Sequence, residues 1–175
     1  MITVELLTKI NYILSIGTIL GMIKIVFLLY DLKYTRIFAT LMSRFGLFFA
    51  LLTVLLGTVL TLVYSEIFGV LPCGLCWLER MMLYPQILIT GTALYLKDKM
   101  APVYGIVLST CGLIISLYHH YIQMGGSEFV RCPASGADCA KRIIFEFGFV
   151  TFPFMAVVLF TLLIVLYIYT LKTQK

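Results

Sequence analysis

The chain has 175 residues, of which 62% are hydrophobic and only 12% are charged. Because a soluble domain is about half apolar and about a quarter charged, this composition excludes a water-soluble globular protein and indicates an integral membrane protein. The formal net charge of +5 does not indicate a nucleic-acid-binding protein, since the Lys and Arg residues are scattered between apolar runs and form no basic cluster.

Five apolar stretches are long enough to cross a membrane, for which about 20 helical residues are needed. They are expected at residues 10–30, 45–64, 77–96, 101–121 and 147–169. Lys24 lies inside the first stretch and no small-residue cleavage pattern follows it, so we expect a retained helix rather than a signal peptide. The sequence therefore predicts an all-α integral membrane helical bundle.

The basic residues predict the orientation of this bundle, because Lys and Arg accumulate in short cytoplasmic loops. With the N-terminus outside, seven basic residues face the cytoplasm and five face outward. The first group is Lys33, Arg36, Arg44, Lys97, Lys99, Lys172 and Lys175, and the second is Lys9, Arg80, Arg131, Lys141 and Arg142. The small excess favours this orientation.

Four of the five cysteines form two pairs, Cys73-x2-Cys76 before the third stretch and Cys132-x6-Cys139 after the fourth. Two crossings separate the pairs, so both are expected on the same, extracytoplasmic side of the membrane. Cys111 lies alone within the fourth stretch and is expected to be a small buried apolar residue.

Three explanations of the paired cysteines remain open: structural disulfides, a zinc site, and redox-active disulfides. A zinc site needs four converging ligands, which His119 and His120 could supplement. A disulfide in a Cys-x-x-Cys motif adds little chain constraint, and such motifs are typical of thiol exchange.

The stretch LPCGLCWLER at residues 71–80 places this motif where the third helix should begin, near Cys76. A thiol at a helix N-terminus has a lowered pKa. Arg80 follows Cys76 by one helical turn and could bind a polar group of a lipid-soluble cofactor, and Tyr84 continues the same face. The alternative is an interfacial Arg80 paired with Glu79.

The stretch PCGLCWLERMMLYP, followed by a histidine-bearing fourth helix and a second cysteine pair, resembles the DsbB/BdbC family of quinone-dependent thiol oxidoreductases. The resemblance covers about residues 45–170 and is nearer the BdbC type, because the second cysteine loop is short. It implies a four-helix thiol oxidoreductase bundle at residues 45–175. Residues 1–44 would then add one N-terminal transmembrane helix and a cytoplasmic loop.

The resemblance also implies roles for individual residues. Cys73 and Cys76 look like the pair coupled to a quinone, either ubiquinone or menaquinone, with Cys76 nearest to it. Arg80 looks like the arginine that contacts the quinone, and His119 and His120 fall near the same site. Cys132 and Cys139 look like the pair that exchanges with a thioredoxin-like partner of the DsbA/BdbD type. The implied location is a prokaryotic cell membrane.

Two other classes of protein remain as alternatives. An enzyme similar to vitamin K epoxide reductase would use a comparable bundle, but its Cys-x-x-Cys motif lies late in the chain, whereas here the motif precedes the third of five helices. The other alternative is a non-enzymatic membrane subunit with structural disulfides or zinc.

Overall fold

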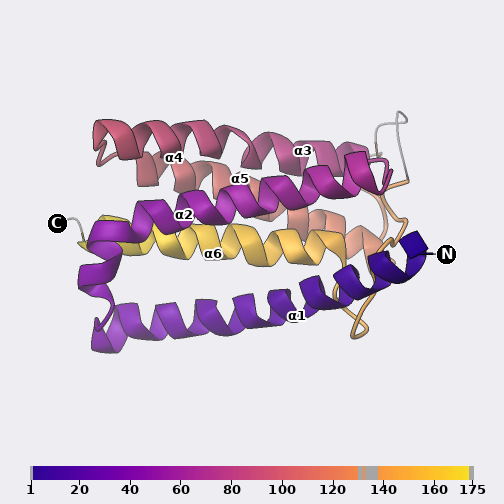
Figure 1. Cartoon of the computed structure of the whole chain (residues 1–175), viewed down its shortest axis with the longest axis horizontal. Coiled ribbons are helices and arrows are strands. Elements are labelled where there is room, and N and C mark those ends of the chain that lie inside the picture. Colours follow the sequence, from indigo (N-terminus) through magenta and orange to yellow (C-terminus); the bar gives the residue numbers. More distant parts are fainter. Residues whose placement is uncertain (1, 130–131, 133–137, 174–175) are drawn as a thin grey trace.

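The computed structural model describes residues 2–129, 132 and 138–173. Arg131 and Lys175, two of the basic residues that predict the orientation, lie outside the described residues. The helices are α1 (Ile2–Tyr30), α2 (Ala39–Leu62), α3 (Gly74–Leu83), α4 (Pro85–Leu96), α5 (Ala101–Gln123) and α6 (Phe152–Thr173). Two π-helical turns, η1 (Asp31–Thr35) and η2 (Val63–Ile67), extend α1 and α2. The helices run side by side along the long axis (Figure 1), which confirms the all-α membrane bundle.

Four helical segments of the described chain are each long and apolar enough to cross a membrane: Glu5–Thr35, Ala39–Ile67, Ala101–Gln123 and Phe152–Thr173. The third crossing that the sequence predicts corresponds to two shorter helices, α3 and α4, which follow one another along one side of the bundle (Figure 1). The sequence predicted one helix here, beginning at Trp77. Instead the helix begins at Gly74 and is interrupted before Pro85, whose ring lacks the N–H needed to continue the hydrogen-bond ladder.

The centre of the bundle is α6, which packs against α1, α2 and α5. Two glycines of α5 allow this close packing: a Cβ atom at Gly112 would lie 2.4 Å from the ring of Phe160, and one at Gly105 would lie 2.4 Å from the ring of Tyr167. Small residues let membrane helices approach closely, and van der Waals packing then holds them together.

The start of α6 differs from the predicted Phe147. Phe147 and Gly148 have φ angles of 53° and 79° and form a turn. Glu146 and Val150 exchange two backbone hydrogen bonds across it, of 3.1 and 2.9 Å. The helix follows Thr151, whose hydroxyl accepts the backbone N–H of Phe154 at 3.3 Å. Left-handed backbone at the turn therefore delays the helix although the sequence is apolar.

Candidate functional site

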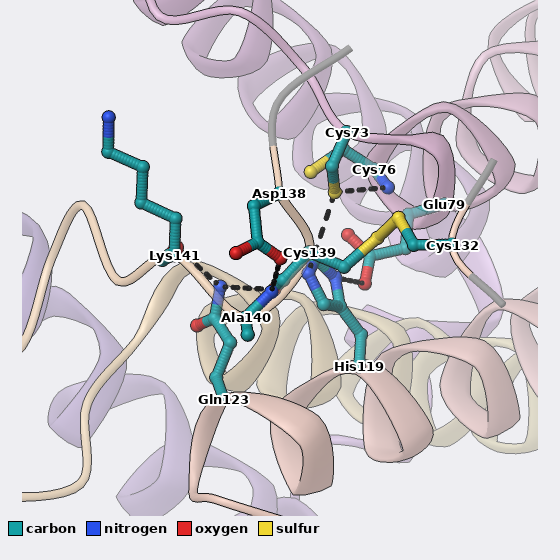
Figure 2. Close-up of a disulfide and its surroundings, with 10 residues drawn as sticks. All are labelled: Cys73, Cys76, Glu79, His119, Gln123, Cys132, Asp138, Cys139, Ala140 and Lys141. Carbon is teal, nitrogen blue, oxygen red and sulfur yellow. Dashed lines mark hydrogen bonds and ion pairs between the residues drawn. A yellow bond between two sulfur atoms is a disulfide. The ribbon is translucent and has the colours of Figure 1, made fainter. Parts of the chain in front are cut away.

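The structure brings the two cysteine pairs into one cluster at one end of the bundle. Cys132 and Cys139 form a disulfide, whereas Cys73 and Cys76 are free thiols. The four cysteines lie close together (Figure 2). All four belong to a small apolar cluster with side chains of α3 and α5. Cys139 is fully buried, and Cys76 and Cys132 are partly exposed. The prediction that both pairs lie at the same end of the bundle is therefore confirmed.

Cys73 is the residue at the N-terminus of α3, in place of the predicted Cys76. Its sulfur accepts the backbone N–H of Cys76 at 3.2 Å and so caps the helix. A hydrogen bond with the Cys76 side chain and the neighbouring His119 lower the pKa of the Cys73 thiol, against the opposing effect of burial. The difference arises because α3 begins earlier than the sequence predicted. Cys73 is thus the thiol of the pair whose lowered pKa favours the thiolate form.

His119 connects this thiol to a carboxylate. Its Nε2 atom lies 3.6 Å from the sulfur of Cys73, and its Nδ1 atom lies 3.0 Å from Oε1 of Glu79. The ring is 1% exposed, which fixes its orientation between α3 and α5. A nucleophile, a base and a group that orients the base are arranged in this way in enzymes that activate thiols.

Glu79 is the residue of this group whose role the sequence did not predict. The alternative interpretation paired it with Arg80, but its carboxylate faces His119 instead. The sequence does indicate that Glu79 lies near the thiols, because it follows Cys76 by three residues and so shares its helix face.

Arg80 is buried, with 9% of its surface exposed. Its Nη2 atom donates to the carbonyl oxygen of Thr61 at 2.9 Å, and its guanidinium lies 5.4 Å from the centre of the Trp77 ring. The hydroxyl of Tyr84 lies 3.0 Å from that of Thr61. Arg80 and Tyr84 therefore both join the third crossing to α2 at Thr61, which the sequence did not predict.

A cavity of about 430 Å³ opens beside the free thiols. Its walls are mostly apolar side chains of α1, α2 and α6, and one end carries polar side chains. The polar side chains at the cysteine end are Cys73, Cys76, Glu79, Arg80, His119, Gln123, Asp138 and Lys141. A volume of this size and an apolar lining with a few polar groups are typical of small-molecule sites. A quinone, with an apolar ring and carbonyl oxygens that an arginine can bind, fits this donor set.

Tyr84 and His120, two of the predicted contacts, lie elsewhere. The described residues that line the cavity include neither of them. The Nδ1 atom of His120 lies 3.0 Å from the Thr151 hydroxyl, and its ring packs against Phe154 at a centroid distance of 5.2 Å. His119 is thus the histidine beside the thiols, and His120 joins α5 to the start of α6.

Gln123, at the end of α5, ties the cysteine loop to the bundle. Its Nε2 atom donates to the carbonyl oxygens of Cys139 at 3.4 Å and Lys141 at 3.2 Å. The side chain is 6% exposed, so water competes little for these bonds. The bonds hold Cys139 in the cluster.

The structure bears on the zinc alternative and on the expectation for Cys111. The disulfide removes Cys132 and Cys139 from a four-thiolate zinc site, since their sulfurs are bonded to each other. The ligand atoms of Cys73, Cys76 and His119 lie within 4.8 Å of one another and could approach one metal ion. Cys111 is exposed on the surface of α5 and not buried as expected.

Comparison with known proteins finds relatives that are described as disulfide bond formation proteins. Residues 43–170 match the family model described as disulfide bond formation protein DsbB. The SPbeta prophage-derived disulfide bond formation protein B of Bacillus subtilis (strain 168) is 42% identical over 107 residues, which are 61% of this chain and 72% of the relative. The probable disulfide formation protein C 2 of Bacillus anthracis is 36% identical over 117 residues (66% and 84%). The disulfide bond formation protein C of Bacillus subtilis (strain 168) is 35% identical over 116 residues (66% and 83%). No solved structure is significantly similar to the chain.

Proposed function

Because the chain belongs to the DsbB family of disulfide bond formation proteins, and is therefore a multi-pass membrane protein-disulfide oxidoreductase, we propose that it passes electrons from a thioredoxin-like protein to a membrane quinone. The protein partner would be of the DsbA/BdbD type, and the quinone ubiquinone or menaquinone. We further propose that the cysteine end faces outside the cytoplasm, and that residues 45–175 form the oxidoreductase core while residues 1–44 add a helix and a loop.

One observation carries the proposal: the free thiols touch both the disulfide cluster and the cavity. Cys73 packs in the same cluster as Cys139, and Cys73 and Cys76 both line the cavity. Electrons that enter at the loop disulfide can therefore leave at the cavity without a large movement of the helices.

Electrons enter by thiol–disulfide exchange. A thiolate of the reduced partner attacks a sulfur of the Cys132–Cys139 disulfide, and the partly exposed Cys132 is the accessible one. The partner's second thiolate then breaks the mixed disulfide, so the partner leaves oxidised and the loop pair holds two electrons.

The loop pair then reduces the second pair. A loop thiolate attacks the Cys73–Cys76 disulfide, a second exchange re-forms Cys132–Cys139, and two thiols remain at Cys73 and Cys76. The bonded loop pair and the free thiols at Cys73 and Cys76 support this order of exchange.

The remaining step closes the Cys73–Cys76 disulfide and releases two electrons and two protons. His119 is placed to hold the proton of Cys73 at Nε2 while Glu79 fixes the ring through Nδ1. Arg80, held by Thr61, presents its charge to the cavity. A quinone bound there would supply an acceptor for two electrons and two protons.

The proposal is tested with purified protein in lipid nanodiscs, by measuring oxidation of a thioredoxin-like dithiol coupled to quinone reduction. Arg80→Ala should raise the KM for quinone about tenfold, the effect of losing one charge-assisted hydrogen bond, while exchange with the protein partner continues. Arg142→Ala is the control, because Arg142 lies at the same end but outside the cavity lining. Quinone kinetics that are unchanged by Arg80→Ala would contradict the role of Arg80, and absence of quinone reduction by the unmodified protein would overturn the proposed function.

A further inference from the structure

The first helix, α1, lies outside the part of the chain that matches the family, which begins at residue 43. It nevertheless forms a wall of the cavity beside the free thiols. The lining residues contributed by α1 are Leu14, Gly17, Thr18, Gly21 and Lys24. Leu14, Gly17, Gly21 and Lys24 follow one another at three or four residues, and Thr18 adjoins Gly17, so all five lie on one face of the helix. The cavity is therefore completed by an element that lies outside the matched core.

The way α1 packs explains why space remains between it and α2. It lies along α6, and α2 lies on the other side of α6 in the same view (Figure 1). At the cysteine end, the hydroxyl of Tyr64 donates to Oδ1 of Asn11 at 2.5 Å, and both residues are buried. This bond ties α1 to the end of α2, while Gly57 and Leu60 of α2 and Gly17 of α1 line the space between the two helices.

The cavity is elongated along α1. From Leu14 to Lys24 the helix rises about 15 Å, at about 1.5 Å per residue, and both residues line the same cavity as Cys76 and Arg80. Apart from the polar end at the thiols, the polar side chains along this length are Thr18, Thr53 and, at the far end, Lys24, and the other wall residues are apolar. A ring bound beside Arg80 would fill only one end, and the rest suits a long apolar chain attached to that ring.

We propose that the face of α1 from Leu14 to Lys24 binds the isoprenoid tail of the quinone, and so makes this enzyme selective for quinones that carry a tail. This inference rests on the proposed function, because the head of the same molecule is the electron acceptor beside Cys76. One cavity is lined both by the thiols and by α1, so a molecule whose ring lies beside Cys76 can place its tail against α1.

Gly17 provides a direct test. A Cβ atom at this position would meet no atom within 4 Å, so a larger side chain can enter the cavity without disturbing the packing of the bundle. The series Gly17→Ala, Gly17→Leu and Gly17→Phe should fill the tail region in steps. Ile13→Phe is the matched control, since Ile13 is 65% exposed, lies on the same helix and is not part of the cavity lining.

The measurement compares the KM for a long-tailed quinone (menaquinone or ubiquinone, whichever the unmodified protein reduces) with the KM for its tailless analogue. Gly17→Phe should raise the KM for the tailed quinone about tenfold, the effect of displacing about two buried CH2 groups, and should leave the KM for the tailless analogue unchanged. Gly17→Leu should have a smaller effect, and Ile13→Phe none.

Several outcomes would overturn the inference. An equal KM for the tailed quinone in all variants would show that the tail does not reach α1. An equal rise for both quinones would show that Gly17 faces the ring and not the tail. If phospholipid and not quinone is lost from the purified Gly17→Leu or Gly17→Phe protein, an acyl chain occupies the groove. Failure of the unmodified protein to reduce any quinone would overturn the proposed function itself. This result differs from failure of the tail-binding inference, because it is seen in the unmodified protein and needs no substitution.

Discussion

Each end of the bundle buries one acidic side chain, Asp31 at one end and Cys73 at the cysteine end. The partners of these two side chains differ in kind. At the end opposite the cysteines, Asp31 is 1% exposed. Its carboxylate accepts hydrogen bonds from the Thr35 hydroxyl, the backbone N–H groups of Ile37 and Phe38, and the Tyr169 hydroxyl. These four donors join the end of α1 to the start of α2 and to α6, so Asp31 holds three elements together.

At the cysteine end, the partners of Cys73 can themselves change state. His119 can gain or lose a proton, Cys76 can form a disulfide, and Glu79 beyond His119 borders the cavity. A buried group with fixed neutral donors stabilises a fold, whereas a group surrounded by titratable partners beside a cavity is suited to chemistry. Substitutions at the cysteine end should therefore change the rate of electron transfer, and substitutions at the Asp31 end should change stability.

The largest effect is expected at the loop disulfide. Cys132→Ala or Cys139→Ala should lower oxidation of the protein partner by about a thousandfold or more, because no other sulfur can take its place in the relay. Each variant should still let a small dithiol reduce quinone through Cys73 and Cys76. The control is Cys111→Ala, which removes the exposed thiol of α5 and should be fully active. Full activity of either loop variant toward the partner would refute the assignment.

The next largest effect is expected at His119. Replacement by Gln should slow the step from small dithiol to quinone about a hundredfold, as expected for loss of a group that transfers a proton. His120→Gln should change this rate little, because His120 faces Thr151 and lies outside the cavity lining. Rates are compared in the same nanodiscs with saturating quinone. Equal effects of the two substitutions would contradict the placement of His119 as the only histidine of the described site.

A smaller change is expected in the pH dependence of Cys73. In Cys76→Ser, which keeps a hydrogen-bonding hydroxyl, the rate of alkylation of Cys73 should follow the thiolate fraction. Because the pKa of Cys73 is lowered, the rate should stay high through neutral pH and fall only in acid, whereas an ordinary thiol becomes reactive near its pKa of about 8.5. Adding His119→Gln should move the midpoint to higher pH. A midpoint near that of free cysteine would contradict the thiolate assignment.

The smallest effect on activity is expected at the opposite end. Asp31→Asn should lower the free energy of unfolding by about 1–3 kcal/mol, since the amide cannot accept all of the hydrogen bonds of the carboxylate. Activity per folded molecule should be unchanged. Tyr169→Phe removes one of the four donors and should cost less. Thermal unfolding in detergent and dithiol oxidation are measured on the same samples. A loss of activity without a loss of stability would show that the two ends are coupled.

The number of crossings and the common side of the cysteine pairs follow from the sequence by itself. Both depend on the length of apolar stretches and on how many of them separate Cys76 from Cys132, and neither depends on packing. The prediction of the membrane bundle was confirmed for this reason. The Cys-x-x-Cys motif likewise indicated where thiol chemistry should be found, because its spacing is local.

Only the tertiary structure decided which side chains meet at the site. Adjacent residues on a helix point in directions about 100° apart, so the rotation of α5 places His119 at the thiols and His120 at α6. A start of α3 at Gly74 placed Cys73, not Cys76, at the helix end. The pairing of Glu79 with His119, the exposure of Cys111 and the wall formed by α1 likewise depend on how helices distant in the sequence pack together. Hydropathy and spacing carry no information about rotation around a helix axis, and that rotation is set by packing.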